Sequence, residues 1–213
     1  MRLRLIAMIV VTLSLGACTS DPKPAAAPTA PAVSAPVIVP GRPGEAARTV
    51  SPAEAATLVP TPTPNAADVT YVRDMIVHHR QALDMAALAP TRAENSRLKS
   101  LASRIRDSQA PEIQFMTTWL QQQGLTAPGH HARHEGMPGM ATPEQIEALK
   151  AASGKDFDRL FLQLMIAHHQ GALKMSEQVL TGGSHLRIEE LANDVTATQS
   201  AEIRRMQEMQ AAL

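Results

Sequence analysis

Two short segments of the sequence combine histidine and methionine in the same order. Residues 75–85 read MIVHHRQALDM and residues 165–175 read MIAHHQGALKM, so seven of eleven positions are identical at an offset of 90. Imidazole binds copper, zinc, nickel and iron, whereas the uncharged thioether is a soft ligand that suits Cu(I). The two segments therefore predict a copper site that prefers Cu(I) and also accepts Cu(II).

On a helix that turns about 100° per residue, the two histidines and two methionines of the first segment fall within an arc of about 120°. They would therefore face the interior of a helical bundle together. The expected metal ligands are Met75, His78, His79, Met85, Met165, His168, His169 and Met175, to which Met116 and Met206 are added from the repeated second helices. The alternative is that these methionines only fill the core, as helical methionines commonly do.

Two polar pairs repeat at the same offset, since Gln109 and Glu112 recur as Gln199 and Glu202. They lie on the apolar stripe of their predicted helices, where a buried polar group needs a hydrogen-bond partner. We expect them to bond to the imidazoles and to orient them around the metal. Alternatively, they lie at the edge of the stripe in water.

A Gly- and Pro-rich connector between the copies contains a second concentration of the same residue types: His130, His131, His134, Met137 and Met140. Short His-rich tracts commonly bind metal. We expect the connector to wrap an ion or to close over the bundle site. The alternative is a solvated loop.

The repeat extends beyond the two segments and predicts an all-α fold. Helical periodicity and end signals predict helices over 65–88, ended by Pro90, and over 95–123, kinked by Pro111. Further helices are predicted over 142–152, 156–180 and 184–211. Repeat one (65–124), a connector (125–141) and repeat two (142–213) would thus form a four-helix bundle of two duplicated hairpins.

The first 64 residues are predicted to lie outside this domain. Residues 1–17 have the basic start and short apolar run of a lipoprotein signal peptide, and Cys18, the sole cysteine, is the expected lipidation site. Residues 18–64, rich in Pro, Ala and Thr, are expected to form a disordered linker. The protein would then be exported and anchored by lipid to the periplasmic or extracellular face of the cell envelope. An ordinary signal peptide with a chance cysteine is the alternative.

Composition limits the functions to consider. The 20 basic and 20 acidic residues balance, which gives no reason to expect nucleic acid as a partner. Aromatic residues make up 2% of the chain, which disfavours an all-β fold. There is no nucleophile arrangement and no phosphate-binding glycine loop, so nothing in the sequence requires catalysis. The expected partners are a metal ion and the membrane, through the lipid anchor alone.

The two M-I-x-H-H-x-x-A-L-x-M motifs are joined through GMPGM-x-TPEQ and G-x-DFDRLF. In these motifs, over residues 68–209, the chain closely resembles the bacterial family called domain of unknown function 305. The resemblance implies an exported, ferritin-like four-helix bundle. Carried over by position, the signature residues of the family are Met75, His78, His79, Met85, Met165, His168, His169 and Met175, with Met137 and Met140 in the connector. Some relatives are periplasmic copper-binding proteins that use His and Met for copper resistance. The chain departs from the family pattern at Pro111.

The predicted function is therefore copper binding for buffering, scavenging or resistance. Two alternatives stay open at this point. One is a lipid-anchored helical interaction module that binds no metal. The other is a ferritin-like metal-dependent oxidoreductase, although Met75 and Met165 stand where the Glu-x-x-His motif of di-iron bundles would need glutamate.

Overall fold

The computed structural model describes residues 35–41, 43–58, 63–129 and 136–213. The predicted signal peptide 1–17 and Cys18 lie outside these residues. The chain divides into two compact units, residues 1–60 and 61–213. No helix in the described part of the chain is long and apolar enough to cross a membrane.

The first unit contains a β-hairpin and a short helix. Strand β1 (Val37–Val39) pairs antiparallel with β2 (Arg48–Val50), with Ile38 opposite Thr49, and α1 (Pro52–Leu58) follows. This differs from the disordered linker expected over 18–64. β-Branched residues supply most of both strands, and Gly44, at φ 91°, takes a left-handed conformation between them. The high proline content of the surrounding sequence hid this local strand pattern.

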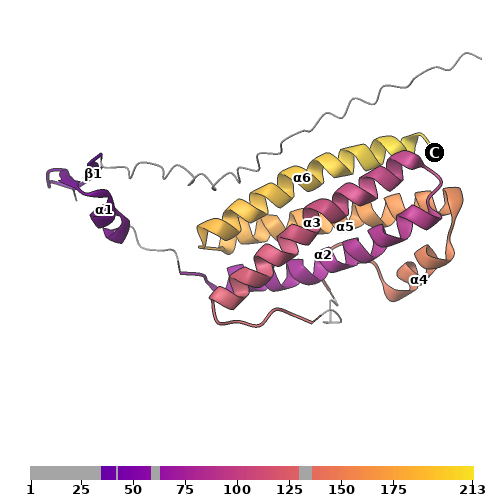
Figure 1. Cartoon of the computed structure of the whole chain (residues 1–213), viewed down its shortest axis with the longest axis horizontal. Coiled ribbons are helices and arrows are strands. Elements are labelled where there is room, and N and C mark those ends of the chain that lie inside the picture. Colours follow the sequence, from indigo (N-terminus) through magenta and orange to yellow (C-terminus); the bar gives the residue numbers. More distant parts are fainter. Residues whose placement is uncertain (1–34, 42, 59–62, 130–135) are drawn as a thin grey trace, which may run out of the picture. The chain divides into compact units, whose positions relative to one another are not determined.

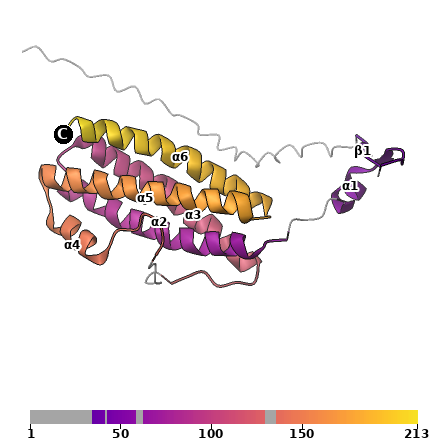
Figure 2. The ribbon, with the colours of Figure 1, turned by 180° about the vertical axis from the view of Figure 1, so that it is seen from behind.

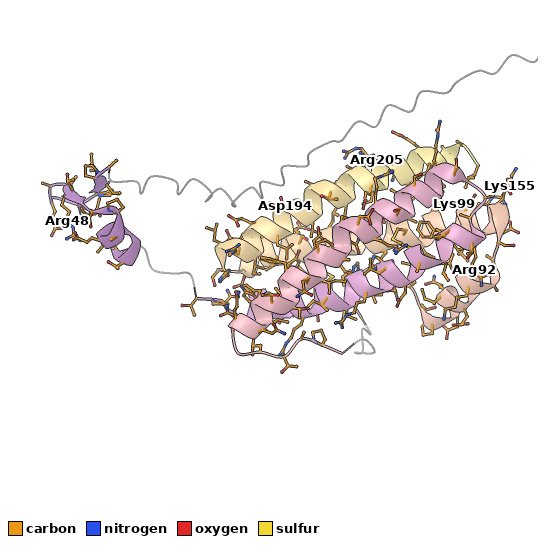
Figure 3. All side chains as sticks on the ribbon, in the orientation of Figure 1. Arg48, Arg92, Lys99, Lys155, Asp194 and Arg205 are labelled. Atoms are coloured by element: carbon orange, nitrogen blue, oxygen red, sulfur yellow. The ribbon has the colours of Figure 1, made fainter. Side chains whose placement is uncertain are left out.

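The second unit is the predicted all-α bundle. Its long helices are α2 (Ala66–Arg92), α3 (Ser96–Gln122), α5 (Gly154–Gly182) and α6 (Leu186–Ala211), and the short α4 (Pro143–Ala151) precedes α5. Helix α2 packs against α3 and α5 against α6, and the two hairpins meet mainly through α2 and α5 (Figures 1 and 2). The expectation of two helical hairpins forming one four-helix bundle is confirmed.

The helix ends follow the sequence closely, with one correction. Asn65 and Asp68 form the capping box that starts α2, and Thr142 and Gln145 form the one that starts α4. Pro90, however, does not end α2, which continues to Arg92. Only two residues of the helix follow Pro90, so the distortion that the proline causes is confined to the last turn. Helix α3 runs without interruption across Pro111.

Two buried aspartates tie the repeats together. The Asp68 carboxylate on α2 accepts a hydrogen bond from the Ser184 amide, 3.1 Å away, just before α6. The Asp158 carboxylate on α5 accepts from the amides of Glu94 and Asn95, at 3.2 and 2.8 Å, just before α3. Each repeat thus caps a helix of the other, where a negative charge is favourable. The duplication therefore forms one interlocked bundle.

Candidate metal centre

The histidine pairs meet in the middle of the bundle. His78 on α2 and His168 on α5 are both fully buried, and their ring centroids lie 3.7 Å apart with an interplanar angle of 35°. Burial, followed by the proximity of His78, His169 and His79, holds the pKa of His168 well below 6.5. His168 is therefore neutral at pH 7, the form in which an imidazole binds metal.

The outer histidine of each pair is held by a glutamate of its own repeat. The Nε2 atom of His79 lies 2.6 Å from a carboxylate oxygen of Glu112, and that of His169 lies 2.8 Å from one of Glu202. When the carboxylate accepts from Nε2–H, the lone pair of the ring is on Nδ1. The Nδ1 atoms of His79 and His169 have no hydrogen-bond partner among the described residues. This carboxylate–histidine arrangement is the one that orients metal ligands in proteins.

The two glutamines behave differently from the glutamates. Gln109 and Gln199 are 2% and 1% exposed, as their position on the apolar stripe predicts. Neither amide bonds to an imidazole: both atoms of each lack a partner within the described part of the chain. The expected glutamine–histidine contacts are therefore not formed. Buried polar atoms without hydrogen-bond partners lower the stability of a fold. A bound metal ion or polar molecule in the middle of the bundle could supply the missing partners.

The six buried methionines lie in the two apolar clusters of the bundle. They fall into two trios, each drawn from three helices and each within a separate apolar cluster. One trio is Met75, Met116 and Met175, and the other is Met85, Met165 and Met206. All six are at most 6% exposed. The offset of 90 residues relates each methionine of one trio to one of the other. Because α2 and α5 are antiparallel, Met75 shares a trio with Met175, and Met85 shares one with Met165.

Imidazoles and carboxylates alone do not form a ready metal cage here. Among the described residues, no group of three or more His, Cys, Asp or Glu side chains is placed so as to hold a metal ion. The other potential ligands in the bundle include the thioethers, the amide oxygens of Gln109 and Gln199, and the nearby backbone. The donor set is therefore softer than that of carboxylate-rich di-iron bundles.

The C-terminal part of the connector contacts His78. The His78 ring donates from Nε2 to the Pro138 carbonyl oxygen, 3.1 Å away. Gln81 forms two hydrogen bonds with the backbone of Ala141, at 2.9 and 2.7 Å. Met137 and Met140 are half-buried there. His130, His131 and His134 lie outside the described residues.

The sequence did not reveal the roles of Gln81, Pro138 and Gly171. Gln81 and Gly171 occupy equivalent positions of the two copies, and both contact the connector. The sequence did contain a signal for these roles: Gln81 and Gly171 are equivalent positions that differ, although most of the surrounding motif is identical in the two copies. His185 and Trp119 form another contact away from the centre, ring edge to ring face at 5.4 Å.

Comparisons with known proteins place the bundle among related structures. The family described as "Domain of unknown function (DUF305)" matches residues 68–210. A DUF305 fragment from Deinococcus radiodurans is 34% identical, with a TM-score of 0.65 over 71% of this chain and 100% of that one. A DUF305 protein from Streptomyces coelicolor, described as a candidate secreted protein, is 31% identical, with a TM-score of 0.64 over 68% and 93%.

CopM in its Cu(II)-bound form is 36% identical, with a TM-score of 0.61 over 68% of this chain and 96% of CopM. CopM has also been solved in Cu(I)-bound, Ag-bound and apo forms. No curated protein matches the chain.

Proposed function

The chain belongs to the DUF305 family, and we propose that it is an exported copper-binding protein that prefers Cu(I) and uses its buried His and Met side chains as ligands. One observation carries this proposal. The buried imidazoles of His78 and His168 lie against each other, and the histidine that follows each of them bonds through Nε2 to a buried or half-buried glutamate. Four imidazoles in this setting are costly to bury unless something binds them.

The donor chemistry favours copper over zinc and iron. The thioethers of the two trios carry no charge, so they add little to a zinc site but suit Cu(I). Glu112 and Glu202 are engaged with imidazoles and would orient them, whereas a di-iron site would use such carboxylates directly. The likeness to CopM, solved with Cu(I), Cu(II) and Ag, supports the same metal class.

The biological role that fits is copper buffering, scavenging or resistance outside the cytoplasm. A protein with Met rather than Cys ligands holds Cu(I) without forming disulfides in an oxidising compartment. Export is supported by the signal pattern of residues 1–17 and by the description of the Streptomyces relative. Cys18 would anchor the protein by lipid, with residues 18–64 between the anchor and the bundle.

The test is a metal competition with the untagged full chain. Cu(I) bound to a chromogenic chelator is titrated with protein, in parallel with Zn(II) titrations, and with wild type and His168→Leu side by side. We expect Cu(I) to be held more tightly than zinc and the variant to lose Cu(I). Tighter zinc binding, or equal Cu(I) binding by both proteins, would overturn the proposal.

A further inference from the structure

The two copies of the histidine motif are equivalent in the helices but not in what lies over them. We propose that residues 136–141, here called the strap, hold the His78 ring from the connector side, so that copper bound between His78 and His168 is exchanged only as fast as the strap lifts. This inference rests on the proposed function and concerns how the same site is filled and emptied.

The first observation is the difference between the stacked imidazoles. The strap carbonyl of Pro138 accepts a hydrogen bond from His78 Nε2. At His168, the equivalent residue of the other copy, both ring nitrogens lack a hydrogen-bond partner among the described residues. The Pro138 bond fixes the His78 ring with its proton on Nε2 and its lone pair on Nδ1, as the glutamates fix the outer histidines, whereas no hydrogen bond from the strap fixes the His168 ring.

The second observation is the seat of the strap on α5. Gly139 has φ 76°, which favours glycine, and a Cβ there would lie 2.3 Å from the Ala167 carbonyl oxygen. A Cβ on Gly171 of α5 would lie 2.0 Å from the Pro138 oxygen. The strap therefore reaches His78 only because glycine stands at both contact points. Gly171 is a positioning residue of the strap.

The third observation is the anchor on α2. Gln81 bonds to both the amide and the carbonyl of Ala141, at the C-terminal end of the strap. On the N-terminal side of residues 130–135, Arg80 donates a hydrogen bond to the Pro128 carbonyl oxygen at 2.7 Å. In the other copy these two positions hold Gln170 and Gly171. Four of the eleven motif positions differ between the two copies, and two of these four, 80/170 and 81/171, are positions where the connector contacts a helix.

The strap also carries thioethers of its own. Met137 and Met140 are half-buried, unlike the six buried methionines of the trios. Soft donors at this depth can take Cu(I) from a carrier before it reaches the imidazoles. Opening the strap breaks the Pro138 contact and the Gln81 bonds. Loss of one net hydrogen bond, about 1.4 kcal/mol, corresponds to about a tenfold change in rate.

The main experiment unseats the strap without altering any His or Met. Gly171→Ala introduces the Cβ that would meet Pro138. Gly182→Ala is the matched control on the same helix, because its Cβ would meet nothing nearer than the Ala67 Cβ at 3.7 Å. Stopped-flow transfer of Cu(I) from loaded full-length protein to bicinchoninate gives the exchange rate. The rate of amide hydrogen exchange of residues 136–141 in the apo proteins shows how often the strap leaves its contacts with the bundle.

We expect Gly171→Ala to speed both Cu(I) transfer and amide exchange about tenfold, while Gly182→Ala behaves as wild type. Gln81→Ala, with the exposed Gln170→Ala as its control, repeats the test without a steric clash and serves if Gly171→Ala does not fold. Binding stoichiometry should be the same in all five proteins.

Three outcomes would count against the strap. Unchanged transfer in both Gly171→Ala and Gln81→Ala, despite normal Cu(I) binding by wild type, would refute the strap and leave the copper function standing. Equal acceleration in the control variants would also refute it, because the effect would not come from the strap. No Cu(I) binding by wild type would remove the proposed function and the strap proposal together, while the amide-exchange result would still report whether the strap is seated.

Discussion

The imidazole rings of His78 and His168 lie with their centroids 3.7 Å apart, although the residues are 90 positions apart in the sequence. They are equivalent residues of the two copies, so their contact lies at the pseudo-twofold axis that relates the hairpins. Two imidazolium cations at this distance would repel each other strongly. Under the proposed function, this axis is where both repeats would share a single ion.

The first prediction separates a ligand from a packing residue. Replacing His168 with Gln should change the free energy of unfolding of the apo protein by no more than about 1–2 kcal/mol, as for most single substitutions. The same change should abolish the copper-induced stabilisation, about 2.7 kcal/mol at a hundredfold excess over Kd. Thermal melts with and without Cu(I) measure both. A variant with a large loss of apo stability and an intact copper shift would identify His168 as a core residue.

The second prediction concerns pH. Burial lowers the pKa of His168 in the folded protein, so below pH 6.5 the unfolded chain binds one proton more than the native state. The stability that the neutral ring contributes is complete above pH 6.5 and is lost as the pH falls below it. Urea unfolding of the apo protein should therefore show a free energy of unfolding that is lower at pH 5.5 than at pH 7.5 because of this group.

The matched comparison for the pH experiment is His168→Gln. The part of the pH dependence that comes from His168 should disappear in that variant. An identical slope in wild type and variant would assign the pH dependence to other groups.

The repeat made much of this fold predictable. Once residues 75–85 and 165–175 are aligned, the remaining helices follow from caps such as Asn65 and Thr142, and the outcome is two hairpins in one bundle. The Glu112–His79 and Glu202–His169 contacts were predictable as well, because a repeated carboxylate on an apolar stripe needs a repeated partner.

The rest depends on relations that a single helix does not contain. A helical wheel gives the direction of Met75 and Met85 but not the antiparallel pairing that sends them to different trios. The strap contacts depend on glycine geometry in a segment without periodicity, where pattern arguments have no basis. The β1–β2 hairpin was missed because its short strands lie among prolines.

The third prediction tests the glutamates. Glu202→Gln removes the charge that holds His169 while keeping the side-chain shape, so Cu(I) affinity should fall about 10–100-fold, as is typical for partners of metal-bound histidines. The control is Glu208→Gln, which makes the same substitution at an exposed position of the same helix and should bind Cu(I) as tightly as wild type. Competition titrations measure both. Equal affinities in the two variants would show that the Glu202 carboxylate does not act through His169.

The fourth prediction concerns the anchor. Cys18→Ser should release the protein from membranes or block its processing, because serine lacks the thiol that would carry the lipid. Fractionation of cells that express wild type or variant measures this. Equal membrane association of the two would rule out a lipid anchor at Cys18.

The fifth prediction tests whether the methionine trios bind metal or only fill space. Leucine has nearly the volume of methionine, so the triple variants Met75→Leu/Met116→Leu/Met175→Leu and Met85→Leu/Met165→Leu/Met206→Leu should both fold, at a cost usually below about 1.5 kcal/mol per site. Because the duplication relates the trios, each variant should lose Cu(I) and Ag(I) affinity to a similar extent while zinc binding stays constant. Isothermal titration with Ag(I), which needs no reductant, compares them directly. If both variants bind Ag(I) as wild type does, the thioethers are core residues and the imidazoles alone form the site. If only one variant is impaired, the two trios are not equivalent despite the repeat.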